Sequence, residues 1–544
     1  MIAIPKEPAP HDGKRLSIWR VLFGITVVAA IAAVAVFGYR FFVVDSARAG
    51  GATPWFAGYV DTTLTPKFAF ENPETPAGTN VVLAFVVAKA ADDCTPSWGG
   101  SYSLDAAGGD LDLDRRIARV RQLGGDAVVS FGGATNTELA TACADVDQLK
   151  NAYGAVVDRY DLSTIDLDIE SDDLADSVAG ERRAAALAAL QAERREAGGD
   201  LAVWLTLPTM PTGLLTDGLR AVSQTLAAGV DLAGVNIMTM DYGIDREGTM
   251  GEAAIDALNA VHSQLGRVYA ANGTDLTDAT LWAKLGATPM IGQNDVAGEV
   301  FTLDDAAELN AFGKQKQLGR LSAWSLNRDR SCGPNYLDVA TVSNLCSGVD
   351  QGDHTFAETL GRHFTGSPSA IAGGQTTRAN AVTNTPEPAT VAPSGTPVPS
   401  RGQEWQGPVD DPASSPYPIW SPTATYLAGA KVVWHGTVFE AKWWSLGNAP
   451  DDPVAAETDT PWLLIGPVLE GETPYAAPTL PAGTFPDWSG TETYEEGARV
   501  LFRGAPFVAK WWTQGDSPAA AAQDSAASPW QMLSSDQVAE IAGG

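Results

Sequence analysis

Three carboxylates occupy alternate positions in one short apolar stretch, as Asp166, Asp168 and Glu170. In an extended strand alternate side chains share a face, so the three carboxylates would lie together, opposite the intervening Ile and Leu side chains. A half-buried strand with its acidic side in water shows the same alternation. In a closed site, mutual repulsion would instead raise at least one pKa. We expect Glu170, the last of the three, to hold a proton for general acid catalysis.

The segment between residues 54 and 364 predicts the elements that would position these carboxylates, because short β-rich runs alternate in it with Ala/Leu-rich helical stretches such as 177–196 and 214–228. The expected strands are 55–60, 81–87, 127–131, 164–170, 201–207, 234–240, 288–292 and 321–326. Eight strands in this alternation predict an α/β fold, a closed (β/α)8 TIM barrel. A doubly wound sheet is the alternative, but no glycine-rich phosphate motif follows the first strand. In a barrel, chemistry gathers at the carboxyl ends of the strands, where Glu170 falls.

Composition narrows the possible partners. The chain has 544 residues and a formal net charge of −31, which disfavours nucleic acid and anionic membrane surfaces as partners. Its 5 histidines are scattered and show no metal-ligand or Ser/His spacing. We expect a mechanism without metal or cofactor.

The first 49 residues predict a membrane anchor. Cationic residues precede an uncharged run from Val21 to Tyr39, long enough to span a bilayer, and Arg40 follows it. The alternative is a secretory signal cleaved near Ala49. Both interpretations export the rest of the chain. In an exported protein the 4 cysteines predict disulfides, and the nearest neighbours in the sequence would pair Cys94 with Cys143 and Cys332 with Cys346.

A Pro/Thr/Ser-rich stretch, 365–415, predicts a disordered linker that lets the C-terminal segments act independently of the barrel. Beyond it the residues of segment 416–467, from Trp420 to Trp462, recur in segment 484–533. Each of these two repeats is too short to bury many aromatic side chains, so exposed aromatics are expected to form a binding face. The candidates are two pairs within the repeated Ala-Lys-Trp-Trp sequence: Trp443, Trp444, Trp511 and Trp512. One Trp of at least one pair is expected to pack inside its repeat.

Residues 130–133 read S-x-G-G, and residues 163–170 match D-x-x-D-x-D-x-E at every fixed position but the first. Further motifs follow in order at 238–243, 289–295 and 323–329. By these motifs, segment 53–364 resembles a bacterial chitinase of glycoside hydrolase family 18. The two repeats resemble the chitin- and cellulose-binding modules of carbohydrate-binding families 5 and 12, which carry the Ala-Lys-Trp-Trp sequence.

Two positions depart from the family pattern. Ser163 replaces the first Asp of the catalytic motif, a position that the resemblance makes structural. Met240 stands where many relatives have Tyr, with Tyr242 one place beyond Asp241. The resemblance therefore leaves the role of Tyr242 open.

The resemblance implies hydrolysis assisted by the substrate. Glu170 would protonate the glycosidic oxygen while the 2-acetamido carbonyl attacks the anomeric carbon. Asp168 would orient the acetamide N–H, and Asp166 would tune Asp168 and share its proton. Asp241 would grip the acetamido group, with Tyr242 as the hydroxyl donor.

The resemblance also implies aromatic and polar contacts with the sugars. Trp324 would form the floor under the reacting sugar, although a buried barrel Trp is the alternative. Met238 would touch substrate or fill the core. The remaining substrate-binding candidates are Tyr59, Phe85 and Gln293.

The expected function is a chitinase that acts on chitin or chito-oligosaccharides as an extracellular, membrane-anchored monomer, with a secreted form as the alternative. Two other functions are considered: an endo-β-N-acetylglucosaminidase acting on N-glycans, and a catalytically inactive chitin-binding protein. Glu170 argues against the inactive form, and the paired aromatic repeats argue for an insoluble polymer.

Overall fold

The computed structural model describes residues 53–544 apart from 245–246, 334–341, 369–408, 452–458, 477, 482, 523–524, 526 and 544. The predicted anchor and most of the predicted linker lie outside the described residues. In the part of the chain that the structure describes, no helix is both long and apolar enough to cross a membrane. Residues 51–544 form one compact unit.

Parallel strands close into the predicted barrel. The first strand position is shared by β1 (Trp55–Phe56), which pairs with the last strand, and β2 (Gly58–Asp61), which pairs with the second. The other strands follow in chain order: β3 (Val81–Ala90), β6 (Ala127–Gly132), β7 (Thr164–Asp168), β8 (Ala202–Met210), β10 (Leu232–Met238), β11 (Leu285–Thr288) and β14 (Arg320–Leu321). Because each pairs with its sequence neighbour and the last returns to β1, the fold is a barrel and the doubly wound alternative is wrong.

The last two strands differ from the prediction. Strand β11 ends at Thr288, so the predicted run 288–292 lies almost wholly beyond it. Strand β14 comprises Arg320 and Leu321, so it shares just Leu321 with the expected strand 321–326. The loops that follow stay paired at one point, through an isolated parallel bridge between Met290 and Trp324. Their backbone remains ordered by hydrogen bonds such as Trp324 N to the Pro289 oxygen at 2.9 Å and Ile291 N to the Trp324 oxygen at 3.0 Å. Apolar residues continue past the strands because these loops are also buried.

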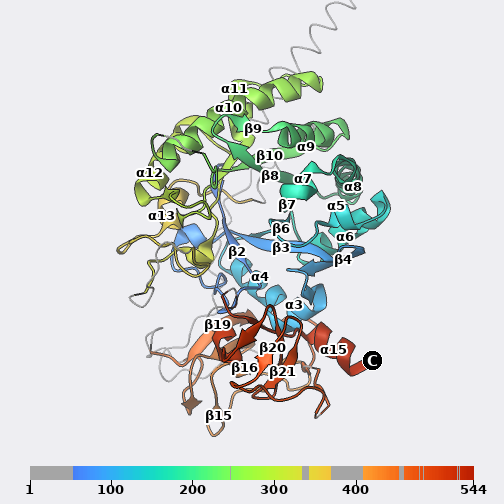
Figure 1. Ribbon diagram of the computed structural model, residues 1–544, viewed down its shortest axis with the longest axis vertical. Helices are drawn as coiled ribbons and strands as arrows, with labels where there is room; N and C mark the ends of the chain where they lie inside the picture. The colour runs from blue at the N-terminus through green and yellow to red at the C-terminus, as the bar shows by residue number, and fades with distance from the viewer. Residues whose placement is uncertain are drawn as a thin grey trace, which may run out of the picture. The chain divides into compact units, whose positions relative to one another are not determined.

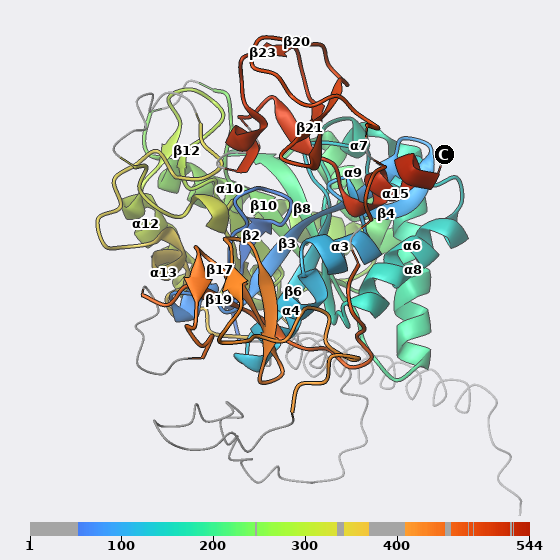
Figure 2. The ribbon, with the colours of Figure 1, turned by 90° about the horizontal axis from the view of Figure 1, so that it is seen from below.

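Helices surround the strands, as Figure 2 shows for β2, β3, β8 and β10 at the centre. The α-helices of the described barrel segment are α3 (Leu104–Asp110), α4 (Leu113–Gln122), α5 (Leu139–Ala142), α6 (Val146–Arg159), α7 (Ser171–Ala175), α8 (Ser177–Glu196), α9 (Thr216–Ala227), α10 (Met250–Ala271), α11 (Asp278–Ala283), α12 (Leu303–Lys316) and α13 (Phe356–Gly361). Helix α8 matches its prediction, and α9 is shorter than predicted by two residues at its start and one at its end. Helices α10 and α12 begin with capping boxes, from Thr249 and Thr302.

Short strands decorate the barrel, and both predicted disulfides are present. An antiparallel extension adds β4 (Asp93–Trp98) and β5 (Tyr102–Ser103) to β3, and two further short strands pair near the carboxyl ends, β12 (Gly292–Gln293) with β13 (Val300–Phe301). A last short strand, β9 (Gly213–Leu214), pairs with β8. Disulfides join Cys94 to Cys143 and Cys332 to Cys346, so the predicted connectivity is confirmed.

The two repeats have the same topology, each with a pair of short strands and a three-stranded antiparallel sheet. In the first repeat these are β15 (Thr425–Tyr426) with β18 (Ser445–Leu446), and β16 (Lys431–Trp434), β17 (Thr437–Ala441) and β19 (Trp462–Pro467). In the second they are β20 (Thr493–Tyr494) with β23 (Thr513–Gln514), and β21 (Arg499–Phe502), β22 (Ala505–Ala509) and β24 (Trp530–Met532). Trp462 and Trp530 are buried at equivalent places, each donating its indole N–H to a backbone oxygen. Helix α15 (Ser535–Gly543) follows the second repeat (Figure 1).

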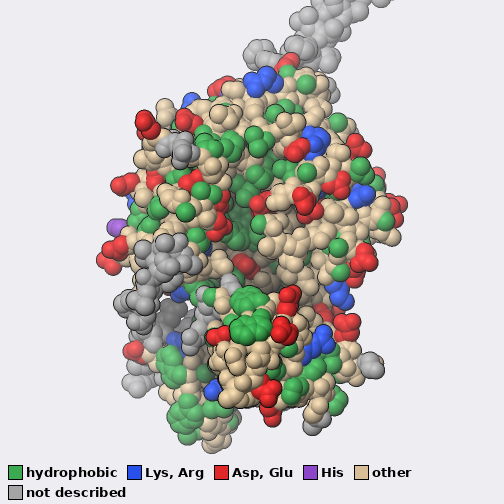
Figure 3. Space-filling view, viewed as in Figure 1, with side chains coloured by type: hydrophobic (Ala, Val, Ile, Leu, Met, Phe, Trp, Pro, Cys, Tyr) green, Lys and Arg blue, Asp and Glu red, His purple; other side chains and the backbone are tan. Residues whose placement is uncertain are grey.

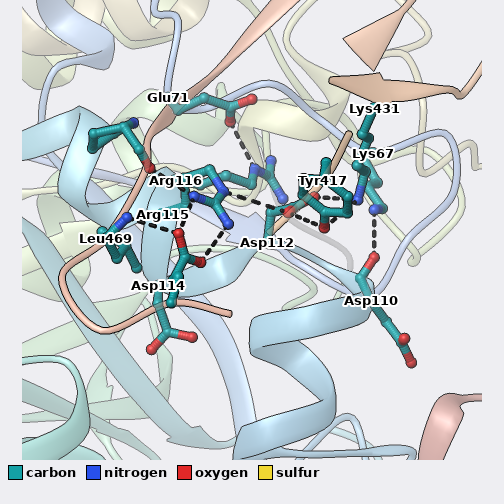
Figure 4. A network of polar contacts seen from close by, with 12 residues as sticks. Lys67, Glu71, Asp110, Asp112, Asp114, Arg115, Arg116, Tyr417, Lys431 and Leu469 are labelled. Carbon is teal, nitrogen blue, oxygen red and sulfur yellow. Dashed lines mark hydrogen bonds and ion pairs between the residues drawn. The ribbon is translucent and has the colours of Figure 1, made fainter. Parts of the chain in front are cut away.

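The first repeat is not independent of the barrel. Asp112, which precedes α4 and is 2% exposed, accepts hydrogen bonds from Tyr417 at 2.8 Å and from Lys431 (Figure 4). Arg115 on α4 forms two hydrogen bonds with Glu472, at 2.6 and 2.9 Å. Although the linker was predicted to leave the repeats independent, these buried polar contacts tie the first of them to the barrel.

Candidate active site

Strand β7 places two of the three carboxylates inside the barrel. Asp166 is fully buried and Asp168 is 5% exposed, and the neighbouring apolar residues of the strand are buried on its other face. Glu170 lies just beyond the strand, partly exposed, as the residue that precedes α7. A half-buried strand with its acidic side in water is therefore not what forms here. The predicted carboxylate cluster is present at the carboxyl end of the strand.

Asp166 lies deepest and is held by four donors. Its Oδ2 accepts hydrogen bonds from Tyr59 Oη at 2.8 Å and Ser130 Oγ at 2.7 Å. Its Oδ1 accepts from Thr206 Oγ1 at 2.7 Å and from Arg320 Nη1 at 2.5 Å. These four hydrogen bonds fix the orientation of the Asp166 carboxylate. The expectation that Asp166 shares a proton with Asp168 stays a prediction.

Asp168 has an oxygen available for a ligand. Its Oδ1 is buried without a hydrogen-bond partner among the described residues, a costly state that an N–H donor from a substrate would relieve. Burial, followed by the charges of Glu170 and Asp166, raises the pKa of Asp168 well above its usual range. Asp168 therefore binds a proton readily and can hydrogen-bond an amide.

The Ser-Phe-Gly-Gly motif brings the backbone close to Asp168. Gly132 has φ +97°, and a Cβ there would lie 2.1 Å from the backbone oxygen of Asp168. Gly133 donates its N–H to that same oxygen at 2.9 Å, and its missing side chain leaves room for the Phe85 ring. Both glycines are needed for this close approach, because a side chain would displace the carboxylate strand or the ring.

Glu170 has the protonation state of a general acid near neutral pH. Burial, and then the charge of Asp241, raises its pKa to about 7. Its side chain makes no capping hydrogen bond to α7, so the carboxyl group is not committed to the helix. A carboxyl group with a pKa near the working pH can both hold and deliver a proton.

Asp241 and Tyr242 follow β10 and are fixed by backbone contacts. Asp241 has φ +49° and accepts the N–H of Val296 at 3.0 Å. Burial is the main cause that raises its pKa. Tyr242 is 5% exposed and belongs to the main hydrophobic core, with its N–H bonded to Glu299 at 2.9 Å. Asp241 is near enough to Glu170 for its charge to raise the pKa of Glu170. Tyr242 packs in the hydrophobic core.

Three aromatic rings lie together beside the carboxylates. Phe85 and Trp324 stack with centroids 5.5 Å apart, and Tyr59 lies edge-on to Trp324 at 6.0 Å. Phe85 and Trp324 are partly exposed, whereas Tyr59 is 1% exposed. Trp324 is therefore not the fully buried barrel Trp of the alternative interpretation. In the space-filling view the barrel face is hollowed, with hydrophobic side chains inside and acidic ones around it (Figure 3).

The other predicted contact residues have mixed surroundings. Met238 ends β10 and is partly exposed, whereas Met240 is 8% exposed. The backbone N–H of Gln293 donates to the backbone oxygen of Ser347 at 2.8 Å. The side-chain oxygen of Gln293 is buried without a hydrogen-bond partner among the described residues.

Three polar residues around Asp166, namely Thr206, Asn236 and Arg320, were not predicted from the sequence. Thr206 and Asn236 lie on neighbouring strands, and Asn236 Nδ2 donates to Thr206 Oγ1 at 3.0 Å. Arg320 pairs with Asp166 from the opposite side of the barrel. The available signal was a lone polar or charged residue in or beside an apolar run, which predicts a buried partner.

The repeats present their own candidate surface. Both aromatic pairs are exposed, at 45% and 56% for Trp443 and Trp444 and at 44% and 54% for Trp511 and Trp512. The expectation that one member packs inside is wrong, because Trp462 and Trp530 fill the interiors instead. Exposed rings of this size can stack on sugars.

Among the described residues no group of His, Cys, Asp or Glu could hold a metal ion. The geometry supplies a general acid, a second carboxylate with an unpaired oxygen, and an aromatic wall. That set can protonate a leaving oxygen and stabilise positive charge beside it.

Two curated proteins are similar to this chain over about half of its length. No protein-family model matches the chain. A probable bifunctional chitinase/lysozyme of Escherichia coli K12 is 38% identical over 290 residues, which is 52% of this chain and 31% of that protein. Endochitinase 11 of Metarhizium anisopliae is 37% identical over 283 residues, or 50% of this chain and 52% of that protein. The chain thus spans about a third and about half of these two relatives.

Among solved structures, the catalytic domain of a hyperthermophilic chitinase from Pyrococcus furiosus is 30% identical. The match covers 57% of this chain and 97% of that one, with a TM-score of 0.49.

Proposed function

We propose that this protein, whose barrel is a chitinase-like catalytic domain of the glycoside hydrolase family 18 type, hydrolyses the β-1,4 bonds between N-acetylglucosamine units of chitin. The observation that carries the proposal is Asp168 Oδ1, buried without a partner among the described residues, beside a Glu170 whose pKa is about 7. An acetamido N–H is the donor this arrangement lacks, and a glycosidic oxygen is the base that Glu170 can protonate.

In the proposed mechanism the substrate supplies the nucleophile, an exception to the scheme in which two enzyme carboxylates act. Glu170 gives its proton to the leaving glycosidic oxygen. The 2-acetamido oxygen attacks the anomeric carbon, the glycosidic bond breaks, and an oxazolinium ion forms. Asp168 accepts the acetamide N–H and stabilises the positive charge. Water then opens the ion, returning a proton to Glu170, and the product retains the β configuration.

The test compares two substrates and two variants. The exported segment should release chito-oligosaccharides from colloidal chitin and leave a high-mannose glycopeptide intact. Glu170→Gln keeps the shape but cannot transfer a proton, so turnover should fall about 10²- to 10⁴-fold while chitin still binds. Glu196→Gln, an exposed position at the end of α8, is the matched control and should retain parental turnover.

Cleavage of the glycopeptide instead would favour the endo-β-N-acetylglucosaminidase alternative. Chitin binding without hydrolysis by the parent would favour the inactive binding protein.

We propose that the two repeats are chitin-binding modules of carbohydrate-binding families 5 and 12. Replacing Trp443, Trp444, Trp511 and Trp512 by Ala in the full chain should weaken binding to crystalline chitin at least 10-fold, because stacking rings dominate contact with a flat polymer. Activity on short soluble oligosaccharides should persist. Leu427→Ala, at another exposed apolar side chain of the first repeat, should leave binding unchanged. Unchanged binding by the quadruple variant would place the binding face elsewhere.

We also propose that the protein works outside the cell as a monomer, held by an N-terminal anchor or released after cleavage near Ala49. The two disulfides support an exported location, because such bonds persist in oxidising compartments. Fractionating cells that express the full chain would locate the activity, and a cytoplasmic enzyme would contradict export.

A further inference from the structure

Arg320 carries a buried positive charge that the proposed mechanism does not use. Its side chain has no exposed surface. Nη1 donates to Asp166 Oδ1 at 2.5 Å, Nη2 to Tyr59 Oη at 3.0 Å and Nε to Ser322 Oγ at 2.8 Å. Because these contacts involve all three nitrogens of the guanidinium group, its orientation is fixed.

Aromatic rings complete the surroundings of this guanidinium. Its central carbon lies 5.1 Å from the Trp55 ring, 5.5 Å from the Tyr59 ring and 5.7 Å from the Trp204 ring. Aromatic faces attract cations, but they replace water poorly, so a buried Arg needs a charged partner. Asp166 is that partner.

The pair also affects the carboxylates closer to the substrate. Asp166 points to the same side of β7 as Asp168, two residues further along the strand. Its negative charge favours a proton on Asp168, whereas the positive charge of Arg320 opposes that effect. Asp166 itself accepts four hydrogen bonds, which fix its orientation.

We propose that Arg320 is a positioning residue for the hydrolysis, which holds Asp166 in a fixed orientation through their buried ion pair and offsets the charge that Asp166 exerts on Asp168. This inference rests on the proposed function. By opposing the effect of Asp166, the positive charge of Arg320 makes it easier for Asp168 to lose its proton. One proton is needed on Glu170 for donation, and an ionised Asp168 is needed when the oxazolinium charge develops.

The test measures pH profiles of kcat/KM and kcat for the full chain on a soluble chito-oligosaccharide. Arg320→Gln removes the positive charge, so every nearby carboxyl pKa should rise and both limbs should move to higher pH by about one unit. Arg320→Lys keeps the charge and should restore the parental limbs, even if kcat falls because Lys cannot reproduce the same contacts. If both variants lose rate while their limbs stay in place, Arg320 is structural and the proposal is wrong.

A second measurement does not depend on turnover. A buried carboxyl with a raised folded-state pKa contributes stability at low pH that is lost as the pH rises through that pKa. Arg320→Gln raises these pKa values further, so its melting temperature should fall more steeply than the parent's between pH 5 and 8. Arg320→Lys should run parallel to the parent. If the melting temperature of Arg320→Gln lies below that of the parent by the same amount at every pH, the proposal is wrong. An inactive parent would contradict the proposed function, and the melting curves would still show whether Arg320 acts on the pKa values of the buried carboxyls.

If Arg320→Gln gives no folded protein, the double variant Asp166→Asn with Arg320→Gln leaves neither charge buried alone. Asp166 influences Asp168 more strongly than Arg320 does, so both limbs, and the pH range over which the melting temperature falls, should then move to lower pH. Unmoved values would overturn the proposal.

Discussion

Glu170 and Asp241 interact through their charges at the candidate active site. The negative charge of Asp241 is the second cause, after burial, that raises the pKa of Glu170 to about 7. A raised pKa means that Glu170 keeps its proton up to neutral pH and loses it above. The alkaline limb of activity should therefore fall near pH 7, as read from kcat/KM for the free enzyme.

Asp241→Asn removes the charge that raises this pKa. Glu170 should then lose its proton at lower pH, and the alkaline limb of kcat/KM should shift to lower pH by about half a unit or more. The control is Asp275→Asn, at an exposed position between α10 and α11, which should leave the limb unmoved. A limb that moves up or stays in place would show that Asp241 does not act on Glu170.

At this scale the sequence predicted the residues that reach the substrate but not those behind them. Asp168 and Glu170 were identified because alternation and motif point to them directly. Arg320 was missed because its partner lies across the barrel, and a contact of that kind depends on closure of the ring. The hydrogen bonds around Asp166 likewise come from several strands together, so they could not be predicted from one strand's sequence.

The strands that carry the site require glycine at positions where a Cβ atom would clash with a neighbouring strand. Gly132 ends β6 with φ +97° and lies against Asp168, whereas Gly198 has φ +86° and open space where a Cβ would be. Gly198→Ala should therefore cost about 1 kcal/mol of backbone strain and nothing more. Gly132→Ala adds a clash with the strand that holds the carboxylates.

Thermal unfolding and turnover of the two variants separate these effects. Gly132→Ala should lower the melting temperature by several degrees more than Gly198→Ala does, and it should also abolish most turnover. Gly198→Ala should retain parental kcat. Equal losses in both variants would mean that β6 does not set the position of Asp168.

Strand order and helix positions followed from the alternation of apolar runs, since α8 and the first six strand positions form close to where they were expected. The seventh and eighth strands were placed too late, because periodicity does not distinguish a buried loop from a strand. The loops after β11 and β14 are mostly buried, and they carry the candidate site residues Gln293 and Trp324.

On the scale of the whole molecule, Asp112 ties the barrel to the first repeat. Burial alone would raise its pKa, but Lys431, Lys67 and the Tyr417 hydroxyl together hold the pKa below its usual range. A lowered folded-state pKa means that this contact stabilises the protein above about pH 4 and is lost as the pH falls through the folded value. The contact should therefore weaken in acid.

Asp112→Asn removes the charge that compensates Lys431, and breaking such a buried pair costs on the order of 3–5 kcal/mol. Hydrogen–deuterium exchange should rise in α4 and in β19, while hydrolysis of short soluble oligosaccharides is unchanged. Asp105→Asn is the control, since Asp105 is 93% exposed in its ion pair with Arg159 and such pairs contribute little. Unchanged exchange in Asp112→Asn would show that the first repeat is held by other contacts.

The repeats illustrate what sequence shows at this scale. Their recurrence predicted two modules with one aromatic pattern, and both have the same strand pairing. Their attachment to the barrel was not predicted, because residues such as Asp112 and Lys431 are ordinary surface charges until the two surfaces meet.

The central claim is that the acetamido group of the substrate, assisted by Asp168 and Glu170, is the nucleophile. Proton NMR during the first minutes of chito-oligosaccharide hydrolysis, before mutarotation, reads the anomer that the enzyme releases. The mechanism predicts the β-anomer, because attack from within the substrate followed by water inverts the centre twice. An α-anomer as the first product would mean direct attack by water and would contradict the mechanism.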